Sequence, residues 1–464
     1  MLLLALAANV CDAQEAVTLE KVDATAKSAA LAGHNAWVLT SAALVLFMTA
    51  PGLAMFYSGL VRKKNVLGVM MQCIFLMGLM TVIWGLYGYS LSFGGDPKSS
   101  ESVMLSLIGN GEYLLMANVE RAWDTASEAV KTPMEDKIPR LSHMLFQGMF
   151  FIITPALICG AFAERMKFST MVVFSILWAT VVYCPLCHWV WDQGILAYGS
   201  PRAIAGGSLD FAGGAVVHIS SGVSALVCSL VMGRRLGFGS EAMRPHNLTY
   251  TTLGAAMLWV GWFGFNAGSQ LGSDGVTASA FATTHFSAAA GTLAWAGLEW
   301  FLRGKPSVLG ACSGAVAGLV CITPAAGYVN PGPAMVMGLL AGGACFFACT
   351  KLKSIFKYDD TLDAFGVHGV GGIVGALLTG VFAAPSLGGT GVYDYVANAV
   401  NPDYSIGGQV WIQLQAVITT IVWSGVVSLI AYKLVDIVIG LRVTEEEERE
   451  GLDISSHGES AYNR

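Results

Sequence analysis

Two segments, Asp210-Phe-Ala-Gly-Gly-Ala-Val-Val-His218 and Asp363-Ala-Phe-Gly-Val-His368, each place an acid and a histidine at the start of an apolar stretch. An ionisable group in hydrocarbon is costly unless it is partnered, so such residues mark candidate sites. A lone histidine in a membrane span more often only bonds a neighbouring helix. Two histidines in corresponding spans favour a shared site.

Apolar runs of about 20 residues, the length that crosses a bilayer core, recur along the whole chain around these segments. Only 12% of the 464 residues are charged and 55% are hydrophobic, which excludes a soluble multidomain protein and a disordered one. The net charge of −6 argues against a nucleic-acid partner. We predict an all-α polytopic membrane protein with eleven transmembrane helices, over 35–60, 66–93, 141–163, 169–190, 210–233, 249–271, 276–301, 308–326, 333–350, 363–384 and 407–440.

The basic residues predict the orientation of these helices. Of the 25 Lys and Arg, 17 fall in the odd-numbered connections and at the C-terminal end, which predicts a cytoplasmic C-terminus and an N-terminus outside. The fifth span then runs inward and the tenth outward, each with four spans before it in its half. This is the pattern of an inverted five-plus-five repeat followed by a final helix, with both histidines near mid-membrane.

The chain divides accordingly. A short apolar run, Leu2–Ala8, predicts a signal peptide over 1–13, although it lacks basic leading residues and a tail is the alternative. The expected order is an extracytoplasmic segment (14–34), helices one to five (35–233), helices six to ten (234–384), an outer loop with helix eleven (385–440) and a cytoplasmic regulatory tail (441–464). We expect a multi-pass protein of the inner membrane.

A group of aromatic residues lies toward the outer ends of the third, fourth and sixth spans. Aromatic rings at helix ends commonly form a belt at the membrane interface, and Trp191 fits such a belt. The alternative is an aromatic cage, because ring faces attract a cation and a hydroxyl accepts its hydrogen bond. The candidate residues are Phe146, Phe150, Trp191, Trp262, Phe265 and Ser269.

Other classes of function fit less well. Cys184-Pro-Leu-Cys187 has no second cysteine pair, so small buried hydrophobes are expected rather than a metal or redox centre. We expect no metal, no cofactor and no enzyme, because metal-ligand motifs are lacking. A receptor using Lys433 conflicts with the number of spans. An ion channel, or a sensor that binds its ligand without useful flux, is an alternative within the transport class.

Several motifs along nearly the full chain resemble those of the Amt/Mep/Rh ammonium transporter family, most closely its bacterial AmtB branch. They are Ala50–Gly59, Gly160–Arg165, Asp210–His218, Gly261–Ser269, Arg303–Ser307, Gly310–Ala315, Asp363–Gly369, and Gly440 through Tyr462. The resemblance implies an eleven-helix homotrimer with one pore per subunit. It also implies a PII-type nitrogen signal protein as a partner at the cytoplasmic face. The loops 94–140 and 201–208 are longer than in the family pattern.

Carried over by matching motifs, the resemblance implies a role for each candidate. Phe146, Trp191 and Ser269 would bind ammonium outside, with Asp210 supporting recruitment or deprotonation. Phe150 and Phe265 would form a stacked gate, and His218 and His368, beside Trp262, would line the pore. Ammonium and potassium are similar in size and charge, so an apolar pore selects by removing a proton that potassium lacks.

Overall fold

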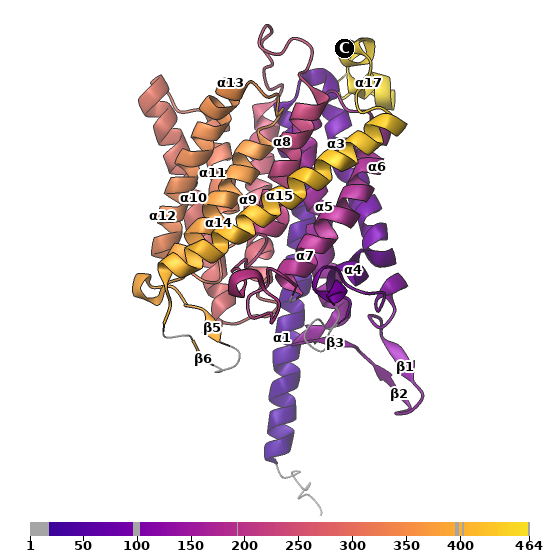
Figure 1. The fold of residues 1–464 in the computed structure, drawn as a ribbon, viewed down its shortest axis with the longest axis vertical. Helices are drawn as coiled ribbons and strands as arrows, with labels where there is room; N and C mark the ends of the chain where they lie inside the picture. Colours follow the sequence, from indigo (N-terminus) through magenta and orange to yellow (C-terminus); the bar gives the residue numbers. More distant parts are fainter. Residues whose placement is uncertain (1–17, 96–102, 193, 395–398, 401–402, 463–464) are drawn as a thin grey trace, which may run out of the picture.

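The computed structural model describes residues 18–95, 103–192, 194–394, 399–400 and 403–462, so the predicted signal peptide lies outside the described residues. This part of the chain folds into one bundle of long helices (Figure 1). Three small antiparallel hairpins occur in the loops. Their strands are β1 (Ala122–Asp124) with β2 (Ala129–Lys131), β3 (Met134–Glu135) with β4 (Ile138–Pro139), and β5 (Tyr393–Asp394) with β6 (Ala399–Val400).

Helices of the first half often continue through a π-helical turn (η). They are α1 (Leu19–Phe47), η1 (Met48–Leu53) and α2 (Ala54–Leu60); α3 (Val66–Ile83), η3 (Trp84–Gly88) and α4 (Tyr89–Phe93); α5 (Arg140–Phe162); α6 (Phe168–Trp178), η6 (Ala179–Tyr183) and α7 (Cys184–Trp191); and η8 (Gly214–Ile219) with α8 (Ser220–Met232). Short 3-10 turns are η2 (Lys63–Asn65), η4 (Met104–Ser106), η5 (Leu114–Met116) and η7 (Ile204–Gly206).

In the second half some helices also continue through a π-helical turn. Its helices are α9 (Leu248–Gly268), α10 (Gly275–Arg303), α11 (Val308–Ile322), α12 (Pro331–Phe347) with η9 (Ala348–Leu352) and α13 (Lys353–Phe356), η10 (Phe365–Gly369) with α14 (Val370–Phe382), the 3-10 turn η11 (Pro385–Leu387), α15 (Ile406–Val438), α16 (Glu445–Glu450) and α17 (Leu452–His457). The 33-residue α15 crosses the bundle obliquely (Figure 1).

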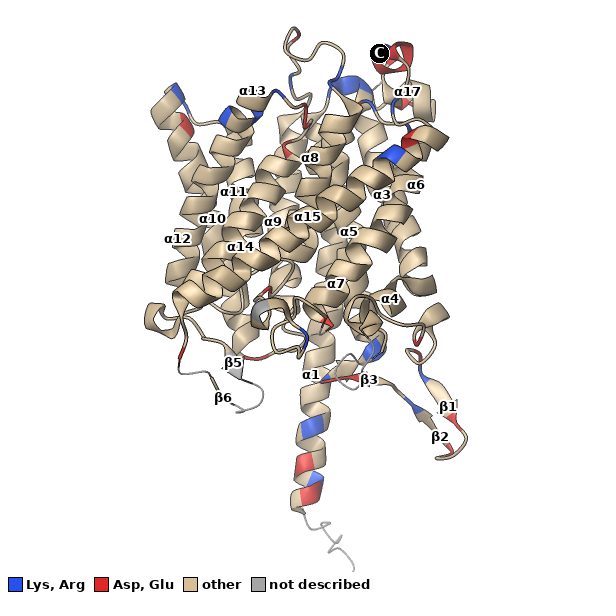
Figure 2. Ribbon diagram, viewed as in Figure 1, with Lys and Arg blue, Asp and Glu red and all other residues tan. Residues whose placement is uncertain are grey.

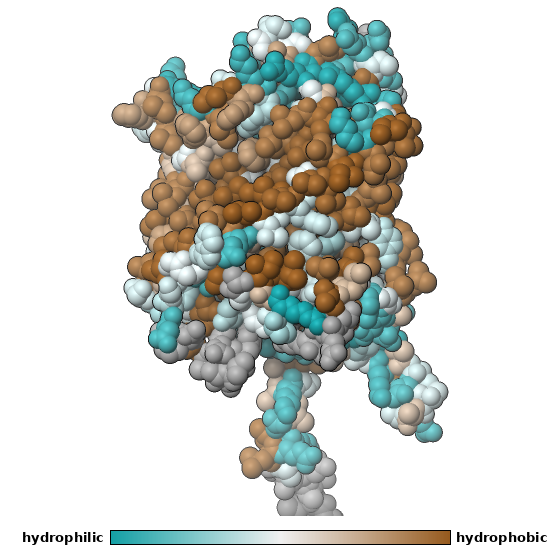
Figure 3. Space-filling model, viewed as in Figure 1, coloured by the Kyte–Doolittle hydropathy of each residue, from teal (hydrophilic) through white to brown (hydrophobic). Residues whose placement is uncertain are grey.

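Eight helical stretches within the described residues are long and apolar enough to cross a membrane. They are 19–60, 63–93, 140–162, 168–191, 214–232, 331–356, 365–382 and 406–438. Helices α9, α10 and α11 cover the other three expected ranges and pack in the same bundle, and their assignment as spans stays a prediction. On the face shown in Figure 3 hydrophobic side chains form a belt across the bundle, and charges gather at its two ends (Figure 2).

Helix α1 begins earlier than expected. It starts at Leu19, where the Thr18 side chain accepts a hydrogen bond from the Lys21 N–H, and not at Asn35. The stretch 19–33 is exposed and projects from the same end of the bundle as the β1–β2 hairpin (Figure 1). Much of the expected extracytoplasmic segment is therefore helical, because its alanine-rich composition favours helix.

Candidate functional site

The two histidines meet in the centre of the bundle. His218 lies in η8 and His368 in η10, and their Nδ1 atoms are 3.3 Å apart. The rings lie 16° from parallel with centroids 5.4 Å apart, and both side chains are buried. A π-helical turn widens a helix locally and often occurs at functional sites. Here each turn carries one of the two imidazoles that the sequence singled out.

Glycines allow the two turns to come this close. A Cβ atom at Gly222, one turn beyond His218, would overlap the backbone of Gly369, the residue after His368. Small residues let helix backbones approach within a membrane. A side chain at Gly222 would therefore push the two turns apart, whereas a Cβ atom at Gly369 would meet the ring of Phe365.

Asp210 caps the turn that carries His218. Its carboxylate accepts hydrogen bonds from the backbone N–H groups of Gly213 (2.9 Å), Gly214 (2.6 Å) and Ala215 (2.8 Å). Gly213 has a φ of 114°, a conformation that side chains rarely adopt. The carboxylate thus caps the start of η8, which carries His218, in the helix-capping role expected from the sequence.

The counterpart of Asp210 in the second half is Asp360, and not Asp363. Each of Asp210 and Asp360 precedes its histidine by eight residues, and Asp360 accepts a hydrogen bond from the Phe365 N–H at 2.8 Å. Asp363 occupies the place of Gly213, with a φ of 59°, and binds the Lys353 ammonium at 2.7 Å. Our pairing of Asp210 with Asp363 missed Asp360, although the equal spacing was visible in the sequence.

A cavity of about 340 Å³ lies above this turn. We name it the outer cavity, and its counterpart the inner cavity, after the orientation expected from the sequence. Trp191, Asp210 and Ser269 line it, together with His143 and Gln147, which were not expected there. The Trp191 indole N–H donates to the Asp210 carbonyl at 3.1 Å, which fixes the ring over the cavity. Ser269 donates its proton to the Phe265 carbonyl at 2.8 Å, so the lone pairs of its hydroxyl oxygen stay available as acceptors.

Phe146 does not line this cavity. It is fully buried and packs edge-on against Phe150, with ring centroids 5.1 Å apart. Its neighbour Gln147 takes the lining position instead. A residue's rotation about a helix axis is set by tertiary packing, which the sequence around Phe146 does not reveal.

Aromatic rings pack between Trp191 and His218, with Phe150 edge-on to Trp191 and tilted, rather than stacked, against Phe265. The centroid of Phe150 lies 5.6 Å from that of Trp191 and 4.5 Å from that of Phe265. His218 stacks on Phe265 and on Trp262, with centroid distances of 5.8 and 5.5 Å. The rings thus form a continuous path from Trp191 to the first histidine.

Below the aromatic rings lies a small cavity, which we call the neck. Its volume is about 10 Å³, which is room for one small molecule. Apolar side chains and the two histidines surround it: Met48, Leu53, Phe56, Ile153, Leu157, His218, Leu258, Trp262, Phe265, Val316 and His368. Among the described residues, none hydrogen-bonds to Nε2 of buried His218. This apolar neck therefore offers polar contact mainly through imidazole nitrogen.

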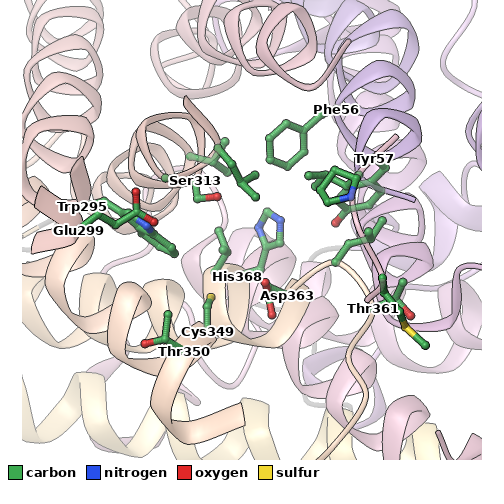
Figure 4. Close-up of a pocket in the computed structure, with 18 of the residues that line it drawn as sticks. Phe56, Tyr57, Trp295, Glu299, Ser313, Cys349, Thr350, Thr361, Asp363 and His368 are labelled. Atoms are coloured by element: carbon green, nitrogen blue, oxygen red, sulfur yellow. The ribbon is translucent and has the colours of Figure 1, made fainter. Parts of the chain in front are cut away.

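An inner cavity of about 280 Å³ opens on the far side of His368 (Figure 4). Phe56, Tyr57, Trp295 and Asp363 contribute to its wall. A cavity thus lies on each side of the neck, and the histidines separate them. No group of three or more His, Cys, Asp or Glu side chains in the described part of the chain is placed to hold a metal ion.

A buried ion-pair network, which the sequence did not reveal, ties the inner loops together. Arg235 binds Glu164 at 2.8 Å and Asp359 at 2.8 Å, and Arg62 also binds Glu164, at 3.0 Å. Burial opposes the charge of Glu164, but Arg235 and Arg62 outweigh this cost and lower its pKa. Burial likewise opposes ionisation of Asp359, and Arg235 lowers its pKa.

A helical bundle with a cavity on each side of a small, apolar, histidine-lined space is the architecture of a multi-pass membrane transport protein. A model of the Ammonium Transporter Family matches residues 36–462, and the chain belongs to this family. Ammonium transport is accordingly its function.

Relatives of known function and known structure agree with this assignment. The chain is 44% identical to the ammonium transporter of Bacillus subtilis, over 90% of this chain and 96% of the relative. It is 44% identical to that of Aquifex aeolicus, over 93% of each. Among solved structures it resembles Saccharomyces cerevisiae Mep2 (TM-score 0.75, 33% identity, 89% and 88% of the chains) and a sensor Amt protein (TM-score 0.79, 26% identity, 93% and 99%).

Proposed function

We propose that the protein binds NH4+ in the outer cavity, removes one proton and conducts NH3 through the neck. The Trp191 ring, the Ser269 oxygen and the negative charge of Asp210 supply complementary contacts for a small cation. Phe150 and Phe265 act as the gate beneath it, and Phe146 supports Phe150 from behind. The observation that carries the proposal is the apolar neck, which separates a cation-attracting cavity from the histidines.

Removal of a proton explains selectivity. One N–H bond breaks, its electron pair stays on nitrogen, the proton passes to water in the outer cavity beside Asp210, and neutral NH3 remains. Transfer of a bare charge into a neck with this lining is far costlier than transfer of a neutral molecule. A potassium ion has no proton to release, so it stays outside.

The paired imidazoles suit ammonia as a guest. Across the Nδ1–Nδ1 contact one ring must donate and the other must accept. The donating ring then has an acceptor at Nε2, and the accepting ring carries N–H at Nε2. The pair can therefore offer ammonia both a donor and an acceptor, and can relay a proton by exchanging tautomers.

The assembly belongs to the same proposal. We infer eleven spans arranged as an inverted repeat plus α15, with the N-terminus outside and the C-terminus in the cytoplasm of an inner-membrane homotrimer. The equal Asp-to-His spacing and the paired π-helical turns η8 and η10 support the repeat. The C-terminal α17 packs on the start of α3, where Asp453 accepts from the Val66 and Gly68 N–H groups. A PII-type signal protein would dock at this face.

Proteoliposomes test the proposal directly. An ammonium gradient should drive uptake through the purified protein, and an equal potassium gradient should not. Equal potassium flux would overturn the selectivity argument. Uptake without selectivity in variants of the neck, but normal selectivity in cavity variants, would assign the selection step to the histidines.

A further inference from the structure

His188, at the outer end of α7, is buried, and each of its ring nitrogens faces a hydrogen-bond acceptor. Nε2 lies 2.6 Å from the Leu105 carbonyl oxygen. Nδ1 lies 3.1 Å from the Ser92 carbonyl oxygen and 3.0 Å from a carboxylate oxygen of Asp192. A neutral imidazole has one N–H donor and one lone pair, so it cannot satisfy both sides.

We propose that His188 is held as an imidazolium whose two N–H groups position the wall of the outer cavity. Leu105 lies in the η4 turn and Ser92 lies in α4, so the ring joins α7 to two other segments. Trp191 is three residues further along α7, where neighbouring side chains share a face of the helix. His188 is thus a positioning residue for the proposed cation site, and this role rests on that proposed function.

The surroundings of the ring are suited to this state. Asp192 supplies the opposite charge, and α4 and η4 present backbone carbonyls. The neighbouring titratable groups on α7 are the thiols of Cys184 and Cys187, both buried and free, which places the CxxC motif in packing rather than in chemistry. Loss of one ring proton would leave the Leu105 or the Ser92 carbonyl oxygen facing a lone pair of the imidazole. A buried hydrogen-bonding group without a partner lowers stability.

Trp189 provides a matched neutral contact with the same loop. Its indole N–H donates to the Leu107 carbonyl at 2.7 Å. Replacement of Trp189 by Phe removes a hydrogen bond to this loop but leaves the charge of the His188 imidazole unchanged. The two residues therefore separate the effect of the charge from the effect of holding the loop.

Nitrogen NMR of the full-length protein in lipid, with labelled histidine, tests the charge. The signal lost in His188→Gln identifies the ring, which should show two N–H groups at about pH 8, where a free histidine is neutral. In Asp192→Asn the doubly protonated fraction at that pH should fall. A single N–H at neutral pH in the wild type would overturn the proposal.

Ammonium uptake tests the positioning role. From about pH 7 to the alkaline pH at which the ring loses a proton, the wild-type KM for ammonium should rise several-fold with kcat nearly constant. His188→Gln should show the raised KM at every pH, whereas Trp189→Phe should keep the wild-type pH profile. A pH-independent wild-type KM beside an imidazolium signal would reject the positioning role. An unchanged KM in Trp191→Leu would instead reject the proposed cation site.

Discussion

Nδ1 of His218 lies 3.3 Å from Nδ1 of His368, although 150 residues separate them in the chain. The contact joins a π-helical turn from each half of the protein beside the small apolar cavity that both histidines line. The imidazoles are therefore one contact between the two halves, and they supply the polar lining of an otherwise apolar neck.

The first prediction concerns this pair. His218→Ala or His368→Ala leaves the other ring without its partner and enlarges the neck, so ammonium-driven flux or selectivity over potassium should be lost. Proteoliposome currents with either cation measure both quantities. His285→Ala, at an exposed position on α10, is the matched control. Wild-type flux and selectivity in both pore variants would contradict the role of the pair.

The second prediction separates the charge of Asp210 from its capping role. Asp210→Ala removes the acceptor of three backbone N–H groups and should abolish uptake even in protein that assembles. Asp210→Asn keeps one oxygen acceptor without the charge and should fold better while still transporting poorly. Gel filtration checks assembly, and uptake checks function. Normal transport by a folded Asp210→Ala would refute a mechanistic role.

The third prediction tests the aromatic cage. Trp191→Leu removes a ring face worth about 2 kcal/mol to a desolvated cation, so the KM for ammonium should rise by up to about 30-fold. Trp123→Leu, on the exposed β1–β2 hairpin, should leave the concentration dependence unchanged. An unchanged KM in Trp191→Leu would indicate that Trp191 belongs to the interfacial belt and does not bind ammonium.

The fourth prediction concerns the buried ion-pair network. Arg235→Gln leaves Glu164 and Asp359 without their shared partner and should cost about 3–5 kcal/mol of stability. Arg234→Gln, at the exposed neighbouring position, should change stability by about 0.5 kcal/mol or less. Thermal unfolding in detergent measures both. Since the pKa values of both acids are lowered, the wild-type stabilisation is present at neutral pH and is lost as the pH falls through those lowered values.

The fifth prediction has the opposite sign. Burial raises the pKa of Asp360 to about 6, although Lys353 opposes the shift. A raised folded-state pKa contributes stability below the unfolded value of about 4, and this contribution is lost as the pH rises through about 6. Asp360→Asn should therefore remove a decline in stability between about pH 4 and pH 6. Identical profiles for wild type and variant in thermal unfolding would rule out this titration.

The sequence patterns predicted most of the helices but few features of the loops. Long apolar runs predicted where helices occur, because the bilayer length requires them, and the two Asp–His segments led to the centre of the site. The helical form of 19–33 was missed because a polar, exposed helix has no apolar periodicity to reveal it. Whether α9, α10 and α11 span the membrane stays a prediction.

The candidate site shows the same division. The residue types at Trp191, Ser269 and His218 pointed to their chemistry, but only coordinates show that Phe146 lies behind the cavity wall. The Glu164–Arg235–Asp359 network joins three loops that are distant in sequence, and no local pattern marks such a contact. Asp360 could have been found, because its distance from His368 repeats that of Asp210 from His218.

The oblique course of α15 has a mechanical consequence. With 33 residues it is about 50 Å long, well beyond the bilayer core, and it packs against both α8 and α14, the helices that continue from the two histidine-bearing turns. A rocking motion of one half against the other would have to slide along this brace. This brace favours the proposed mechanism, in which ammonium loses a proton inside a conduit of fixed bore, over one in which the two halves swing apart.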